Sequence, residues 1–276
     1  MNDTPPYIFD TDLRHANRLR ADSRDKPADF LRLEIAERLQ DRLQDVNRPF
    51  EAVLDVGDDM MRLTGRRSGI ETVDISDKPL ALEGGRYGLI VSNLVMHWVN
   101  DLPGLLVQLN RALKPDGFFL ASMFGGETLK ELRHALLAAE AELTGGANAR
   151  IIPFADVRAT GALLQRAGFA LPVADTDTLT VTYDHPLKLM HDLRNMGETN
   201  ALLGRSKKFL RRDVLARACE IYQKEYALES GRIPATFQIV YLTGWHPHES
   251  QQKPMKRGSA TMRLGDALKQ KPSSEK

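Results

Sequence analysis

Residues 52–57 read Ala-Val-Leu-Asp-Val-Gly, a short apolar run that carries one acid and stops at a glycine. This pattern predicts a buried strand that ends in a turn. An acid and a glycine at such a strand end are typical of nucleotide-type loops, because glycine lets the backbone approach a ligand and the next helix offers free N–H groups. The tetrapeptide from Leu54 to Gly57 is equally compatible with ordinary turn chemistry, so the surrounding sequence has to decide.

Strand and helix patterns alternate on both sides of this stretch. Short apolar runs predict further strands at residues 70–75, 89–93 and 118–124. Apolar residues at helical spacing predict helices at residues 30–43, 102–113, 129–143 and 156–167. This alternation predicts an α/β fold with a doubly wound, mostly parallel sheet that helices cover on both faces.

The order of elements changes in the last third of the chain. Strand patterns at residues 173–183 and 237–242 flank helical patterns at residues 186–196 and 212–228. We therefore predict an antiparallel edge strand and a helical lid over the carboxyl end of the sheet, where ligands bind in such folds.

Composition limits the kind of protein this can be. The 276 residues carry a net charge of +1, which gives no reason to expect binding to nucleic acid or to a membrane surface. The single cysteine, Cys219, excludes an internal disulfide and any site built from several cysteines. Because the sequence has neither a membrane-length apolar run nor a signal-peptide pattern at its start, we expect a cytoplasmic protein.

A polar and aromatic group follows the strand predicted at residues 89–93. Asn93 stands at the carboxyl end of that strand, and His97 and Trp98 follow on the next loop. This is the ligand side of a parallel sheet, so these side chains are candidates for a site. The alternative is that His97 caps a helix and Trp98 belongs to the core.

Several motifs carry a resemblance to a known family. Residues 55–57, the strand at 89–93 and the run Leu113-Lys114-Pro115-Asp116-Gly117 resemble successive motifs of class I methyltransferases that use S-adenosylmethionine (SAM). A narrower subfamily has motifs similar to four segments here, residues 94–103, 123–129, 189–198 and 244–251. It contains the methyltransferase-like assembly factors of respiratory complex I, which are arginine hydroxylases. Its well-known cousin is the malonyl carrier-protein methyltransferase of biotin synthesis.

This resemblance spans the chain from about Phe9 to Leu268 and implies a Rossmann-like methyltransferase fold. We divide the chain accordingly into five expected segments. They are an N-terminal helical segment (1–48), a methyltransferase-like core (49–183), a helical insertion or lid (184–232), a last strand with an ordered tail (233–268) and a disordered tail (269–276). The resemblance also implies SAM contacts from four residues, Asp55, Gly57, Asp74 and Asn93.

The cofactor loop departs from the family pattern. The superfamily loop runs Asp-x-Gly-x-Gly-x-Gly, and the same positions here hold Asp55, Gly57, Asp59 and Met61. The lost glycines leave space beside the cofactor in the family, whereas Met61 adds bulk and Asp59 adds a charge that repels a carboxylate. We therefore hypothesise that SAM binds weakly, in an altered pose or not at all.

The connection after the second strand is also short. Few residues lie between Ile75 and Leu89, although a crossover with its own helix needs roughly 10–12. One strand–helix unit of the family is therefore predicted to be missing. Gly88 stands where the family usually has an acid.

The resemblance places the substrate near five candidate catalytic residues, His97, Trp98, Glu198, His248 and Glu249. Asn93, Arg194 and Asn200 are further candidates for contact with the substrate. A carboxylate such as that of Glu198 or Glu249 can bind a guanidinium through two hydrogen bonds. His248 and Glu249, with His97 or His191, also fit a metal site, but the alternative of an ordered tail is favoured and no metal site is predicted.

Three functions remain open from the sequence. The first is an enzyme that modifies a protein side chain, either by hydroxylating an arginine of a complex I subunit or by transferring a methyl group from SAM. The second is a chaperone that holds a complex I subunit without turnover, which the altered cofactor loop favours. A carrier-protein methyltransferase is the third, and it requires an intact SAM site. The expected partner is thus a complex I subunit, with no nucleic acid.

Overall fold

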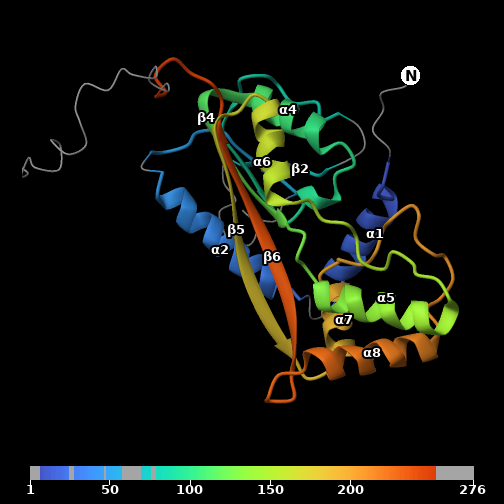
Figure 1. Cartoon of the computed structure of the whole chain (residues 1–276). Coiled ribbons are helices and arrows are strands. Elements are labelled where there is room, and N and C mark those ends of the chain that lie inside the picture. The colour runs from blue at the N-terminus through green and yellow to red at the C-terminus, as the bar shows by residue number, and fades with distance from the viewer. Residues whose placement is uncertain (1–6, 25–27, 47, 58–69, 76–78, 253–276) are drawn as a thin grey trace, which may run out of the picture.

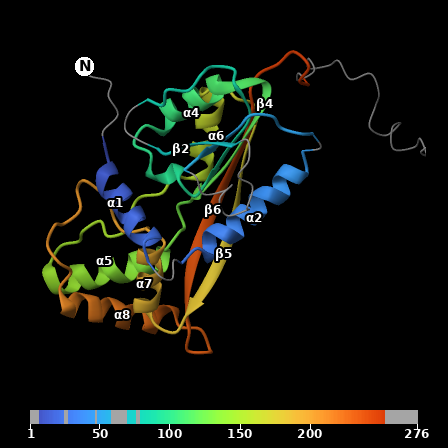
Figure 2. The same cartoon turned by 180° about the vertical axis from the view of Figure 1, so that it is seen from behind.

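The computed structural model describes residues 7–24, 28–46, 48–57, 70–75 and 79–252 (Figures 1 and 2). The predictions about Asp59, Met61 and the tail at residues 269–276 lie outside these ranges. No described helix is long and apolar enough to cross a membrane.

One mixed sheet forms the centre of the molecule, with the strand order β2-β1-β3-β4-β6-β5. The first four strands in this order are parallel, and β6 runs antiparallel to both of its neighbours. The strand bounds are Val53–Val56 for β1, Ile70–Val73 for β2, Tyr87–Asn93 for β3, Leu113–Phe124 for β4, Ala170–Tyr183 for β5 and Ile233–Trp245 for β6. The predicted α/β fold class is confirmed, and the antiparallel pairing lies at one edge of the sheet.

At the opposite edge, the sheet has fewer strands than the expected family fold. Strand β2 is the outermost strand there, and the chain returns past β1 to enter β3. The described residues on this connection, 74–75 and 79–86, contain no helix or strand. Among the described residues, the sheet therefore lacks the strand–helix unit that the short spacing predicted to be missing.

Helices cover both faces of the sheet. On one face, α2 (Phe30–Gln44) packs with α5 (Lys130–Thr144), α7 (Pro186–Asn195) and α8 (Arg212–Tyr226) around alternate residues of β3, β4 and β6. The other face holds α4 (Leu102–Ala112) and α6 (Val157–Arg166). Figures 1 and 2 show α6 and α2 on opposite sides of the sheet. The apolar periodicity in each strand thus sorts into two separate cores.

Strand β6 extends beyond the short strands at its amino end, and a group of helices packs there. Helices α5 and α8 lie side by side there, next to α7 and near α1 (Thr11–Asp22) (Figures 1 and 2). Tyr222 of α8 donates a hydrogen bond of 2.7 Å from its hydroxyl to the Pro234 carbonyl of β6. The helices at residues 186–196 and 212–228 were predicted to form a lid, and they build this group together with α5.

The predicted turn at Pro115-Asp116-Gly117 lies inside the range of β4. The pairing with β3 moves from Tyr87–Leu113 to Leu89–Phe118, so the turn loops out of the ladder as a bulge. Asp116 has a positive φ of 61° there, which is compatible with its short polar side chain. The motif is thus a structural feature at the amino end of the parallel strand.

Gly88 owes its identity to close backbone contact. Its N–H donates to the carbonyls of Glu51 and Ala52 at 3.1 and 3.0 Å. A β-carbon at this position would lie only 2.5 Å from the Glu51 carbonyl oxygen. The acid that the family carries at this position would therefore clash with the backbone.

Candidate functional site

Three of the predicted catalytic residues meet in one buried cluster. The Glu198 Oε2 atom accepts a hydrogen bond of 3.0 Å from Trp98 Nε1 and lies 3.2 Å from His97 Nε2. The side chain of His97 is fully buried, and that of Glu198 is 10% exposed. These residues come from loops that are about a hundred positions apart in the sequence, so the fold alone brings them together.

Local backbone structure fixes each partner. His97 and Trp98 belong to a short 3₁₀ helix, η1 (Met96–Trp98), that follows directly from the carboxyl end of β3. Glu198 ends helix α7 in a Schellman motif, in which Gly197 has φ +80° and donates to Arg194 O, while Glu198 N donates to Leu193 O. Glycine is required at 197 because the left-handed conformation there disfavours other residues. The helix end therefore aims the carboxylate at η1.

Arg32 completes the cluster, and the sequence analysis did not identify it. Its Nη2 atom donates to the Met196 carbonyl at 2.6 Å and lies 3.5 Å from Glu198 Oε1. Arg32 is only 4% exposed although it stands in the apolar stripe of α2 beside Ile35 and Ala36. A charged residue within a helical apolar stripe is the signal that could have revealed it.

Asn93 supports α2 rather than an open site. Its side-chain amide donates to the Arg32 carbonyl at 3.0 Å, and its Oδ1 accepts from Ser122 Oγ at 3.0 Å. Asn93 is fully buried. It therefore positions the helix that carries Arg32, and its own polar atoms are already engaged within the protein.

Aromatic rings surround the histidine. The ring centre of His97 lies 4.7 Å from that of Phe124 and 5.9 Å from that of Phe154, and Trp98 packs edge-on against Phe9 at 5.3 Å. Within the described residues, no hydrogen-bonding group reaches the buried His97 Nδ1 atom. The cluster thus combines a buried carboxylate with apolar walls.

A small inner pocket opens beside the Glu198 carboxylate. Its volume is about 40 Å³, and Glu198 and Arg150 line it together with apolar residues that include Phe124, Leu129, Ile152 and Phe154. That volume corresponds to roughly three water molecules. Asn200 also borders the pocket, while its amide donates to the Ala149 carbonyl at 2.8 Å. Arg194 is exposed on α7.

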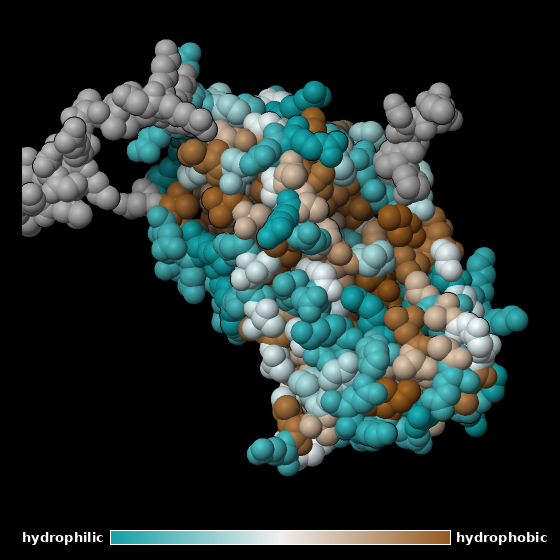
Figure 3. Space-filling view, in the orientation of Figure 1, coloured by the Kyte–Doolittle hydropathy of each residue, from teal (hydrophilic) through white to brown (hydrophobic). Residues whose placement is uncertain are grey.

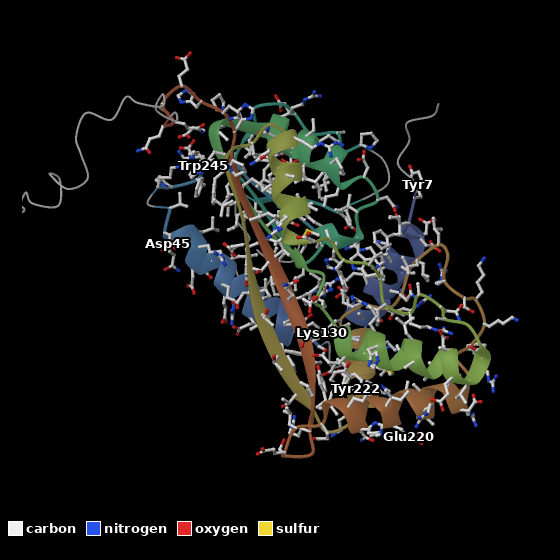
Figure 4. The ribbon with its side chains drawn as sticks, in the orientation of Figure 1. Tyr7, Asp45, Lys130, Glu220, Tyr222 and Trp245 are labelled. Atoms are coloured by element: carbon white, nitrogen blue, oxygen red, sulfur yellow. The ribbon has the colours of Figure 1, made fainter. Side chains whose placement is uncertain are left out.

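His248 and Glu249 lie at the other end of the sheet and do not join the cluster. They follow Trp245, which Figure 4 shows at the end of β6 opposite to Tyr222 and Lys130. Both residues are exposed, and His248 Nδ1 pairs with the Ser250 hydroxyl at 2.7 Å.

The nearby Gln251 explains what this tail segment does. It donates from its side-chain nitrogen to Asp116 Oδ1 at 2.9 Å and to the His246 carbonyl at 2.8 Å. Desolvation alone would raise the pKa of Asp116, but hydrogen bonds from Gln251 and Arg48 outweigh it and hold the pKa below its usual value. The segment therefore clamps the tail onto the β4 bulge. The described residues contain no group of three or more His, Cys, Asp or Glu side chains that could hold a metal ion.

The four residues predicted to contact SAM are not equally accessible. Asp55 is fully buried, as is Asn93. Gly57 N donates to the Val73 carbonyl at 2.8 Å, and a β-carbon on Gly57 would lie 2.5 Å from Val95 Cγ2. This glycine thus makes room for Val95.

Asp74 is the fourth of these residues, and its side chain is 53% exposed. Its two oxygens lie 3.4 Å from Arg14 Nη1 and His15 Nδ1. Asp74 is thus the accessible acid of the set.

A second buried carboxylate holds the loop that lines one side of the inner pocket. Glu140 of α5 is 2% exposed and accepts hydrogen bonds from Asn148 N at 2.6 Å and from Arg150 Nε and Nη2 at 2.9 and 2.6 Å. Desolvation would raise the pKa of Glu140, but these bonds outweigh it and lower the pKa. Glu140 therefore fixes the loop that places Arg150 beside the pocket.

Comparison with known proteins identifies a matching family model, related sequences and a similar solved structure. A family model described as a methyltransferase domain matches residues 9–172. Arginine-hydroxylase NDUFAF5, mitochondrial, of Danio rerio is 41% identical over 87% of this chain and 83% of its own length. The malonyl-(acyl-carrier protein) O-methyltransferase of Halorhodospira halophila is 33% identical over 78% of this chain and 81% of its own length. The solved structure of YcgJ from Bacillus subtilis overlaps with a TM-score of 0.49 at 12% identity, over 77% of this chain and 99% of that one.

The Glu140 arrangement predicts a specific pH dependence of stability. Because the folded state lowers the pKa of Glu140, its contribution is present above the usual carboxyl pKa and is lost as the pH falls through the lowered value. We expect Glu140→Gln to reduce the free energy of unfolding by about 3 kcal/mol at neutral pH, since it leaves Arg150 without its carboxylate. Urea denaturation at a series of pH values measures this difference, which should shrink toward acid pH. A difference that does not vary with pH contradicts the assignment.

Proposed function

The chain belongs to the methyltransferase-domain family, and we propose that it hydroxylates an arginine side chain of a protein substrate during the assembly of respiratory complex I. Support comes from the relatives named arginine hydroxylase, with which it shares 41% identity, and from the subfamily motifs in the sequence. The proposed partner is a subunit of complex I. Those relatives are named mitochondrial, and the cytoplasmic location expected for this chain remains a prediction from sequence.

The Glu198 carboxylate is the observation that carries this proposal. A guanidinium is planar and presents its N–H donors as a fork, which a carboxylate recognises with high directional specificity. Glu198 Oε2 is engaged by Trp98 and His97, whereas Oε1 lies 3.5 Å from Arg32, which is longer than an optimal N–H···O hydrogen bond. Oε1 can therefore accept hydrogen bonds from an arginine that enters the inner pocket.

Local charge and shape also suit an arginine. Glu198 places a negative charge at the inner pocket, and an incoming guanidinium can pair with it. Phe124 and Phe154 line the pocket, and a guanidinium can stack on an aromatic ring.

These residues bind and orient the arginine, and the reaction itself needs co-substrates. Hydroxylation breaks a C–H bond of the side chain and inserts an oxygen atom from O₂, while the second oxygen atom leaves as water with two electrons and two protons from a reductant. In our proposal Glu198 fixes the guanidinium. Trp98 and His97 hold one oxygen of Glu198, and Arg32 lies 3.5 Å from the other.

We further propose that SAM has no catalytic role in this chain. Asp55 and Asn93 are fully buried, and Val95 fills the space beside Gly57. These contacts support the hypothesis that SAM binds weakly or not at all.

Isothermal titration of the purified protein with SAM tests this directly. We expect no binding at micromolar concentration, and the same for the variant Asp74→Asn. A one-to-one complex with micromolar affinity would overturn the proposal. It would also reopen methyl transfer to a carrier protein, the reaction named for the bacterial relatives.

A paired substitution tests the role of Glu198. In a strain that lacks the protein, we expect Glu198→Gln to restore about 100-fold less arginine modification than the wild type, because the amide cannot balance the guanidinium charge. Glu249→Gln is the matched control, since Glu249 lies at the opposite end of the sheet, and should restore full modification. Mass spectrometry of the complex I subunits, at equal soluble levels of each variant, gives the measurement. The proposal is contradicted if both variants lose arginine modification equally, or if neither variant loses it.

A non-catalytic chaperone is the second candidate function, and the altered cofactor loop favours it. In that case the client arginine carries the same modification with and without the protein, and only the amount of assembled complex I falls. Mass spectrometry of the deletion strain separates the two functions.

A further inference from the structure

An outer hollow adjoins the inner pocket. It lies between α5 and the loop at residues 147–154 and has a volume of about 500 Å³. Four residues line both spaces, namely Arg150, Ile151, Ile152 and Phe154. The loop at residues 147–154 is thus a wall with the Glu198 pocket on one side and the outer hollow on the other.

Because the two spaces differ in size, we expect them to hold different parts of the substrate. The inner pocket has room for roughly three water molecules, which suits a slender planar group but excludes a peptide backbone. An arginine that reaches Glu198 must therefore leave its backbone and its neighbours outside the inner pocket. The outer hollow shares four lining residues with the inner pocket and falls within the size range of binding pockets.

The lining residues of the outer hollow that can make new contacts are apolar. Leu136 and Leu137 of α5 face Ile151 and Pro153 across the hollow. Figure 3 shows brown, hydrophobic residues scattered among teal ones over the lower right of the molecule, where Figure 1 places α5. Leu137 lines the hollow and is 38% exposed, so its side chain is available for new contacts.

The charged groups of the hollow are already bonded within the protein. Arg133 donates to the carbonyls of Gly126 and Thr128 at 3.3 and 3.1 Å, and Arg150 is held by Glu140. A polar substrate group would have to compete with these bonds, whereas an apolar side chain gains by leaving water. The chemistry of the hollow therefore selects an apolar side chain.

We propose that the outer hollow is a specificity subsite, which holds an apolar side chain of the substrate protein next to the target arginine. This inference rests on the proposed function, since it assumes that Glu198 receives that arginine. The substrate class is thereby narrowed to proteins in which the arginine has a leucine-sized apolar neighbour.

Peptide binding tests the subsite without requiring turnover. Two fluorescent peptides that differ only in the residues flanking a central arginine, one with leucines and one with alanines, are titrated against each protein variant. Fluorescence anisotropy gives each Kd. We expect the wild type to bind the leucine peptide about tenfold more tightly, which is the effect of burying one such side chain. Leu137→Glu should remove this preference.

Leu143→Glu is the matched control, because Leu143 lies on the same helix with 37% exposure but does not line the hollow. It should retain the preference, and thermal melting should show both variants folded. Glu198→Gln should weaken both peptides equally. If Glu198→Gln weakens binding but Leu137→Glu and Leu143→Glu behave alike, the subsite is overturned and the proposed function stands. If Glu198→Gln has no effect on either peptide, the proposed function fails, and the subsite with it.

Discussion

The burial of the Glu198 carboxylate is the constraint around which this end of the molecule is arranged. A buried carboxylate costs several kcal/mol unless charges and hydrogen-bond donors compensate it. Here the compensation comes from two separate parts of the chain, η1 with His97 and Trp98, and α2 with Arg32. A Schellman motif fixes the end of α7 that carries Glu198, and the amide of Asn93 fixes α2. The same carboxylate borders the inner pocket, which is the arrangement that our proposal requires.

The two ends of the sheet differ in the contacts of their polar groups. At the carboxyl end of β3, polar groups converge on a pocket. At the opposite end, Gln251 clamps the tail by donating hydrogen bonds to Asp116 Oδ1 and to the His246 carbonyl. Beside the first strands, Val95 packs against Gly57 and Asp74 pairs with Arg14.

Periodicity in the sequence predicted most of the elements, since buried strands and amphipathic helices leave strong local patterns. The motifs also predicted His97, Trp98 and Glu198, which the fold brings together. They could not reveal that His248 and Glu249 lie elsewhere, because β6 is antiparallel and its last residues emerge at the opposite end from those of β3. Arg32 and Glu140 escaped prediction because their partners are distant or irregular in sequence, and only the folded chain shows which charges meet.

The central claim is that the carboxylate held by Trp98 receives an arginine. The two tryptophans of the chain report on it separately, since Trp98 donates its indole N–H to Glu198 while Trp245 lies at the far end of β6. A ¹H–¹⁵N spectrum should show two indole signals, which the variant Trp245→Phe assigns. On titration with an arginine peptide, the account predicts that the Trp98 signal shifts and the Trp245 signal stays. A Trp98 signal that does not move at saturating peptide would contradict it.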